Sequence, residues 1–134
     1  MKIKLMIAQS LLFISVIAMG GTLDDLPKNP LGYSQLTANQ LAKIIDQKDF
    51  PLVNVHVPYN GEIPGTDANI AYYDLERIVQ LFPDRKSTIV IYCRSGAMSY
   101  KTAVGLVKMG YEKVIDLTGG YNSWRSLGQP LSYQ

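Results

Sequence analysis

Cys93 is the only cysteine in the 134-residue chain. It stands at the end of a β-branched run and before a short glycine-containing segment, within TIVIYCRSGAMS from Thr88 to Ser99. A strand that passes through a tight loop into a helix directs backbone N–H groups into one concavity, where the helix dipole adds positive potential. A cysteine at the start of such a loop is favoured as the thiolate, its nucleophilic form. The sequence therefore predicts a reactive thiol beside a cradle for an anionic sulfur or oxyanion.

Three other interpretations of Cys93 must be weighed against this one. Free cysteine is among the most buried residue types, so composition alone favours an inert core residue. A thioredoxin-type dithiol is excluded because the chain holds no second cysteine. Cysteine phosphatases with a similar strand, loop and helix place an arginine six residues after the nucleophile to clamp the phosphate, and this chain has Ser99 there. Phosphatase chemistry is therefore not expected.

The segments around Cys93 alternate between helix and strand patterns. Thr37 and Gln40 have the spacing of a capping box at a helix start, and Gly110 suits the left-handed end of a later helix. The sequence predicts helices over 36–48, 74–82 and 98–109, strands over 51–57, 88–93 and 113–117, and a short aromatic helix around Trp124. This order predicts an α/β fold with a small, mostly parallel central sheet between helices. Ligands of such sheets lie beyond the carboxyl ends of the strands, where Cys93 falls.

The first 20 residues have the layout of a secretory signal peptide. Lys2 and Lys4 precede an apolar run over 5–19, and small residues follow. Because the run is nearly long enough to span a membrane, an uncleaved anchor is the alternative, and a membrane contact is expected only in that case. Residues 21–32 are predicted to be a linker and 33–131 the folded domain. The expected location is outside the cytoplasm, periplasmic or extracellular. Without the two lysines, 11 basic residues balance 11 acidic ones, so a nucleic-acid partner is not expected.

Three segments in order resemble one known family: LVNVHVPYNGEIPGT, IVIYCRSGAMS and GYEKVIDLTGGYNSW. Over roughly residues 33 to 131 the chain resembles single-domain rhodanese-like sulfurtransferases, most closely the exported members. The resemblance implies a three-layer α/β/α fold without a metal or organic cofactor. It also implies that Cys93 takes sulfane sulfur from a small anionic donor, such as thiosulfate or a persulfide. The cysteine would hold this sulfur as a persulfide and pass it to a thiol or another thiophilic acceptor.

The same resemblance implies which residues surround the sulfur. The expected cradle is the loop that follows Cys93, with Arg94, Ser95, Gly96, Ala97, Met98 and Ser99 as substrate-binding residues. Arg94 either orients the donor or pairs with an acidic neighbour, and Ser99 either donates to the persulfide or serves the helix start. Many relatives carry a cationic or hydroxyl residue where this chain has Met98. That departure supports an alternative: the same fold acting without catalysis, as a binding or adaptor module for an anion, a sulfur carrier or a protein.

Three residues outside the loop are expected behind the site. Asn54 and His56 replace the aspartate and arginine of the common family pattern, and Glu62 replaces a histidine. His56 lies either near the active site or in an ordinary hydrogen-bonded turn. Tyr121 and Trp124 are expected to be core residues.

Overall fold

Five parallel strands form one sheet at the centre of the protein, seen in a computed structural model that describes residues 23–134. Their order across the sheet is β1-β5-β4-β2-β3. The strands are β1 (Ser34–Leu36), β2 (Leu52–Asn54), β3 (Ala68–Asn69), β4 (Ile89–Tyr92) and β5 (Val114–Leu117). The helices are α2 (Ala38–Ile44), which runs into the 3-10 helix η2 (Ile45–Gln47), α3 (Leu75–Leu81), α4 (Ala97–Lys108) and α5 (Gly120–Ser126). The predicted signal peptide lies outside the described residues.

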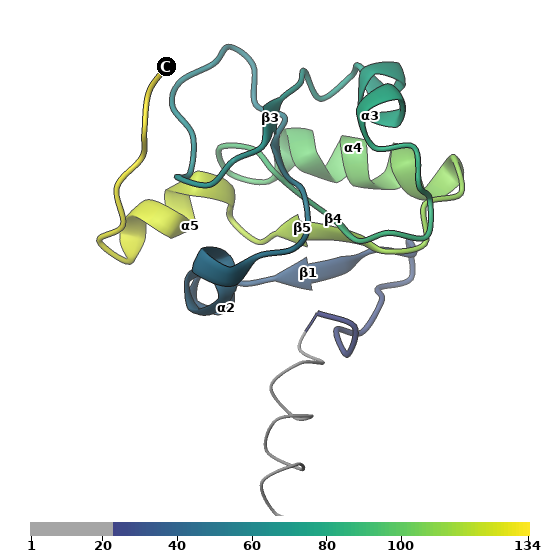
Figure 1. The fold of residues 1–134 in the computed structure, drawn as a ribbon, viewed down its shortest axis with the longest axis horizontal. Coiled ribbons are helices and arrows are strands. Elements are labelled where there is room, and N and C mark those ends of the chain that lie inside the picture. The colour runs from purple at the N-terminus through teal and green to yellow at the C-terminus, as the bar shows by residue number, and fades with distance from the viewer. Residues whose placement is uncertain (1–22) are drawn as a thin grey trace, which may run out of the picture.

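Helices cover both faces of the sheet. Figure 1 shows α3 and α4 on one face and α2 and α5 on the other. Side chains of β4 alternate between these layers: Ile91 joins the core cluster under α4, and Val90 joins the cluster with α2 and α5. Every residue of β4 is buried because this central strand is covered from both sides. This is the three-layer α/β arrangement that the sequence predicts.

Local signals set several helix ends as predicted. The Thr37 hydroxyl accepts a hydrogen bond from the Gln40 backbone N–H at 3.1 Å, and the Gln40 side chain accepts one from the Thr37 N–H at 2.9 Å. This reciprocal pair is the capping box that starts α2. Gly110 follows α4 with φ of 93°, a conformation that suits glycine.

The structure differs from the predicted elements at several points. β1 and β3 were not predicted, because strands of three and two residues are too short to show a period in the sequence. The strand predicted over 51–57 extends only over Leu52–Asn54, and the helix predicted over 98–109 is shifted by one residue to Ala97–Lys108. In the segment predicted to be a linker, Leu23 and Leu26 pack against the core cluster of α2 and α5.

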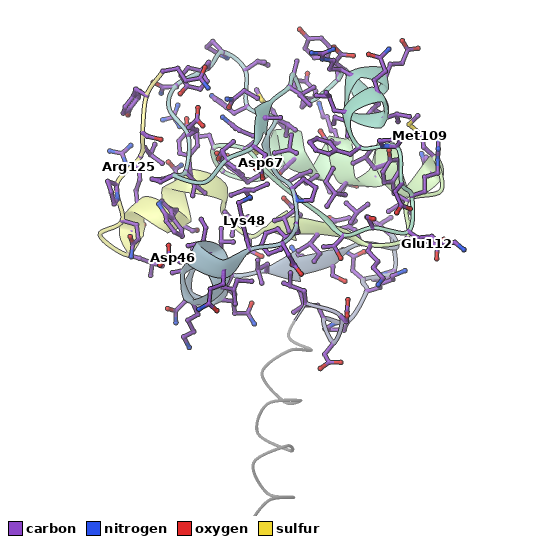
Figure 2. The ribbon with its side chains drawn as sticks, in the orientation of Figure 1. Asp46, Lys48, Asp67, Met109, Glu112 and Arg125 are labelled. Carbon is purple, nitrogen blue, oxygen red and sulfur yellow. The ribbon has the colours of Figure 1, made fainter. Side chains whose placement is uncertain are left out.

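Charged side chains lie on the outside of this fold. Figure 2 shows Glu112 and Arg125 at opposite ends of the molecule, both pointing away from the ribbon. Glu112 lies just before β5, at the amino end of the sheet, and Arg125 lies in α5, beyond the carboxyl ends. Within residues 23–134, no helix has the length and apolar character that crossing a membrane requires.

Candidate active site

Cys93 directly follows the central strand β4, at the carboxyl end of the sheet. The residue is 2% exposed. Its Sγ accepts a hydrogen bond from the Gly96 backbone N–H at 3.0 Å and donates one to Ser99 Oγ at 3.4 Å. A backbone N–H aimed at sulfur favours negative charge on that atom. The loop and the first turn of α4 therefore hold the sulfur in place.

The N-terminus of α4 lies beside the Cys93 sulfur. No side chain among the described residues caps this helix, so the N–H groups of its first turn are left for another acceptor. Gly96 takes φ of 122°, and apart from its chain neighbours no described residue places an atom within 4 Å of the position that a Cβ would occupy there. The backbone can thus turn sharply into the helix and leave space open. A helix start with free N–H groups next to a thiol is suited to hold an anion.

The N-terminus of α5 fixes the loop from behind. The N–H of Tyr121 donates to the Cys93 carbonyl at 2.9 Å, and the N–H of Asn122 donates to the Arg94 carbonyl at 3.0 Å. Gly120 has φ of 58°, and a Cβ there would overlap the Cys93 carbonyl oxygen and lie 2.6 Å from the Arg94 carbonyl carbon. Only glycine permits this close approach. Sequence reasoning did not find these contacts, although the segment TGGYNSW was the available signal.

The remaining residues of the predicted cradle have different environments. Arg94, Ser95 and Ala97 are exposed, whereas Ser99 is fully buried. Met98 belongs to the first turn of α4 rather than to the loop, and its half-buried side chain packs against the core cluster under that helix. The loop proper is therefore shorter than predicted, because the helix begins at Ala97.

His56 lies next to this loop. Its ring meets the buried Tyr121 ring edge-on, with 5.8 Å between the ring centroids. Burial, followed by the positive charge of Arg94, lowers the pKa of His56, so the imidazole is neutral at pH 7. A neutral ring adds no second positive charge beside Arg94. The buried positions of Tyr121 and Trp124, at 1% and 3% exposure, confirm that both are core residues.

Asn54 and Glu62 belong to a separate polar network. The Asn54 side chain donates to Asn69 Oδ1 at 3.0 Å and accepts from the His56 N–H at 3.1 Å. Glu62 Oε1 accepts hydrogen bonds from Tyr59 at 2.8 Å, from Asn69 at 3.1 Å and from Gln134 at 3.0 Å. Among residues 23–134 no hydrogen bond joins Glu62 to the loop after Cys93. The structure thus links Asn54 to the site through the backbone of His56, and it links Glu62 to Asn54 through Asn69.

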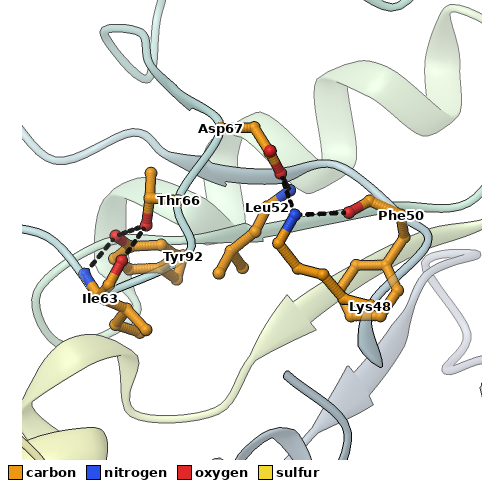
Figure 3. A network of polar contacts seen from close by, with 7 residues as sticks. All are labelled: Lys48, Phe50, Leu52, Ile63, Thr66, Asp67 and Tyr92. Atoms are coloured by element: carbon orange, nitrogen blue, oxygen red, sulfur yellow. Dashed lines mark hydrogen bonds and ion pairs between the residues drawn. The ribbon is translucent and has the colours of Figure 1, made fainter. Parts of the chain in front are cut away.

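Tyr92 anchors the strand residue just before Cys93. Its hydroxyl accepts from the Ile63 N–H at 2.9 Å and lies 2.6 Å from Thr66 Oγ1, as Figure 3 shows. Burial raises the pKa of the Tyr92 phenol, so the group is a neutral hydrogen-bonding partner. The same figure shows Asp67 accepting from Lys48 Nζ at 2.6 Å and from a backbone N–H of β2. These contacts join the segment between β2 and β3 to the sheet.

Asp116 is a residue near the site that sequence reasoning missed. It lies on β5, is 4% exposed, and its Oδ1 has no hydrogen-bond partner among the described residues. Burial raises the pKa of this carboxyl to about 6, although the nearby Ser99 hydroxyl acts in the opposite direction. The signal was one acidic residue inside the apolar segment KVIDL. Over 23–134 no cluster of three or more histidine, cysteine or acidic side chains is arranged to hold a metal ion.

Comparisons with known proteins identify the family to which this fold belongs. Residues 37–127 match the family described as Rhodanese-like domain. A sulfurtransferase of Allochromatium vinosum is 37% identical over 98 residues, which cover 66% of this chain and 84% of the relative. Thiosulfate sulfurtransferase GlpE of Pseudoalteromonas translucida is 26% identical over 103 residues, covering 72% and 92%. The rhodanese-like domain of an Anabaena protein superposes with a TM-score of 0.66 at 24% identity, covering 75% of this chain and 79% of that one.

Proposed function

Because the chain belongs to the rhodanese-like domain family, we propose that it is a sulfurtransferase that carries sulfane sulfur as a persulfide on Cys93. One observation carries this proposal. The Cys93 sulfur accepts the Gly96 N–H at 3.0 Å, directly beside the uncapped start of the 12-residue helix α4. The same donors that favour a thiolate also favour the terminal anionic sulfur of a persulfide.

The proposed reaction has two steps that share one anion site. In the first, the Cys93 thiolate attacks the outer sulfur of thiosulfate; an S–S bond to Cys93 forms, and the bond to the sulfonate sulfur breaks. The electron pair of that bond leaves with sulfite. In the second, a nucleophilic acceptor attacks the outer sulfur of the persulfide and removes it, which restores the Cys93 thiolate. Neither step changes the net charge, and neither requires a metal or an organic cofactor.

The burial of Cys93 limits which partners can react. At 2% exposure, the sulfur admits a small donor or acceptor, or the narrow end of a larger one. We take the donor to be a small sulfur-containing anion, thiosulfate or a persulfide, and the acceptor to be a thiol or another thiophile. Arg94 is exposed beside the loop, where its charge can attract an anionic donor. Met98 cannot supply charge, so the donor is held by backbone groups and Arg94.

Intact mass measurement tests the persulfide directly. After incubation with thiosulfate or a polysulfide, we expect a gain of one sulfur, about 32 Da, that is absent in Cys93→Ser. Thiocyanate formation with cyanide as acceptor then measures turnover. Loading without turnover, or thiosulfate binding without loading, would support the binding-module alternative. No mass gain with any donor would refute the enzyme proposal.

A second variant tests how the donor is held. Met98→Arg restores a cation at the start of α4, and we expect a lower KM for thiosulfate with little change in kcat. Met109→Arg is the matched control, because Met109 lies at the other end of the same helix. An unchanged KM in Met98→Arg would show that the existing groups are sufficient to hold the donor.

The location of the protein is a separate proposal that rests on the sequence of residues 1–20. We propose that this segment directs export and is then either removed or kept as an anchor. N-terminal sequencing of protein isolated from the native host distinguishes the two, since cleavage would expose a new terminus near Gly20. Recovery of an intact Met1 in the cytoplasmic fraction would refute export.

A further inference from the structure

Asp116 and Cys93 lie on the same face of the sheet, on neighbouring strands. Asp116 of β5 pairs with Ile91 of β4, two residues before Cys93. Since side chains alternate along a strand, Ile91 and Cys93 share a face, and both belong to the core cluster under α4. Val114 belongs to the same cluster, which places Asp116, two residues later, on this face as well. The carboxyl therefore lies in the layer between the sheet and α4.

Ser99 of α4 connects the two groups. It is fully buried, and its Oγ is 3.4 Å from the Cys93 sulfur. Its hydroxyl also acts to lower the pKa of Asp116, against the larger effect of burial. In the observed arrangement the Ser99 hydroxyl donates to the Gly96 carbonyl at 3.3 Å, so it offers a lone pair to the Cys93 S–H. Asp116 Oδ1 is buried and has no hydrogen-bond partner within residues 23–134. A buried carboxyl oxygen without a partner is costly to keep, and this one lies on the sheet face that holds Cys93, under the helix that carries Ser99.

We propose that Cys93 and Asp116 share one proton through the Ser99 hydroxyl, and that Asp116 is a positioning residue for sulfur transfer. When the carboxyl is ionised, Ser99 donates to it and accepts from the Cys93 thiol. When the proton passes from Cys93 through Ser99 to Asp116, the S–H bond and the original Ser99 O–H bond break. A new Ser99 O–H and an Asp116 O–H form in their place. The result is a thiolate and a neutral acid, with Ser99 accepting from Asp116 and donating to the sulfur.

This arrangement avoids placing two negative charges in one buried layer. A persulfide anion on Cys93 is stabilised if Asp116 is protonated and Ser99 donates to the sulfur, and it is opposed if Asp116 is ionised. Other groups near Asp116 do not replace this role. Tyr33, before β1, is the titratable neighbour from that side; burial, with Asp116 among the smaller causes, raises the pKa of its phenol, so it is neutral. Tyr100 of α4 meets Tyr33 edge-on, with 6.5 Å between the ring centroids. In the part of the chain that the structure describes, no basic side chain offsets the effect of burial on the pKa of Asp116.

Proton sharing is a property of the Cys93 thiol itself. Only its benefit to sulfur transfer rests on the proposed function. Its test is the pH dependence of Cys93 alkylation by iodoacetamide, measured from about pH 5 to 10. In the unaltered protein we expect two steps, with the main one at high pH, because the second proton leaves against an existing negative charge. Asp116→Asn should give a single step whose midpoint lies roughly one pH unit below that main step. Glu112→Gln removes a charge at the far end of the sheet and should leave the profile unchanged.

Ser99→Ala tests the connecting hydroxyl. If the proton is shared through Ser99, the effect of Asp116→Asn should be at least halved in a Ser99→Ala background. Superimposable alkylation profiles for the unaltered protein and Asp116→Asn would overturn the proposal, as would a full shift that is independent of Ser99. Persulfide loading followed by mass separates this result from the proposed function. A shifted alkylation profile without persulfide loading supports proton sharing and refutes sulfur transfer. Persulfide loading with superimposable alkylation profiles supports sulfur transfer and refutes proton sharing.

Discussion

Replacing Asp116 with asparagine isolates the stability cost of the buried carboxyl. Burial, only partly opposed by Ser99, raises the pKa of Asp116 from 3.8 to about 6. The native state therefore binds this proton more tightly than the unfolded state does. A pKa difference of one corresponds to about 1.4 kcal/mol, so the step from 3.8 to about 6 corresponds to about 3 kcal/mol.

The sign of this effect follows from where each state loses its proton. Well below pH 3.8 the carboxyl is neutral in both states, so its ionisation does not affect stability. As the pH rises towards 6, the unfolded state gains by ionising while the native state cannot, and the free energy of unfolding falls by about 3 kcal/mol. Asparagine does not ionise. The stability difference between Asp116→Asn and the unaltered protein should therefore grow in favour of the variant by more than about 2 kcal/mol between pH 4 and pH 8.

Urea unfolding at a series of pH values measures this difference. Trp124 is the only tryptophan in the chain and is 3% exposed, so its fluorescence reports the loss of the α5 core. The other carboxyls are common to both proteins, so their contributions cancel in the difference. Glu112→Gln, at the exposed opposite end of the sheet, should show no such trend. A difference between Asp116→Asn and the unaltered protein that stays constant from pH 4 to 8 would refute the reasoning.

Four further substitutions, one of them a control, test the supports of the fold and of the site. Gly120→Ala should lower the free energy of unfolding by about 2 kcal/mol or more and abolish persulfide loading, because a Cβ forces α5 away from the Cys93 carbonyl. Gly128 also has a positive φ, of 80°, but there is open space where a Cβ would lie. In urea unfolding, Gly128→Ala should therefore show only the stability cost of the strained backbone, and persulfide loading should be intact. Tyr92→Phe leaves the buried Ile63 N–H unpaired and should cost about 1–3 kcal/mol in the same assay. Thr37→Ala removes one half of the capping box and should cost about 1 kcal/mol without altering alkylation of the thiol; a larger loss would contradict a purely local role.

The parts of the site that were predictable are encoded within a few consecutive residues. The β-branched run before Cys93, the glycine at 96 and the apolar period of the next helix together specify strand, loop and helix without reference to the rest of the chain. The capping box at Thr37 is local in the same way. Since each of these signals lies within a few residues, the carboxyl end of β4 could be predicted as the site before the sheet was known.

The parts that were not predictable depend on contacts between distant segments. β1 exists as a strand because Ser34 pairs with Ile115, and β3 because Ala68 pairs with Val53. Neither three nor two residues carry a period that distinguishes them from a loop. The α5 clamp joins residue 120 to residue 93 through a steric requirement, and the sequence shows only a pair of glycines there. Burial of the His56 ring against Tyr121 likewise depends on how α5 packs.

Asp116 shows why register, more than composition, decides what a residue can do. In the segment KVIDL, an acidic residue can face either layer, and a change of register by one residue would turn it towards α2 and α5. Pairing with Ile91 directs it instead to the layer that holds Cys93 and Ser99. A carboxyl in that layer disfavours folding above about pH 6 and at the same time gives the sulfur a group with which to share a proton. If sulfur transfer at Cys93 uses that group, the stability cost of Asp116 and the pH dependence of the thiol arise from one ionisation, so Asp116→Asn must remove both together.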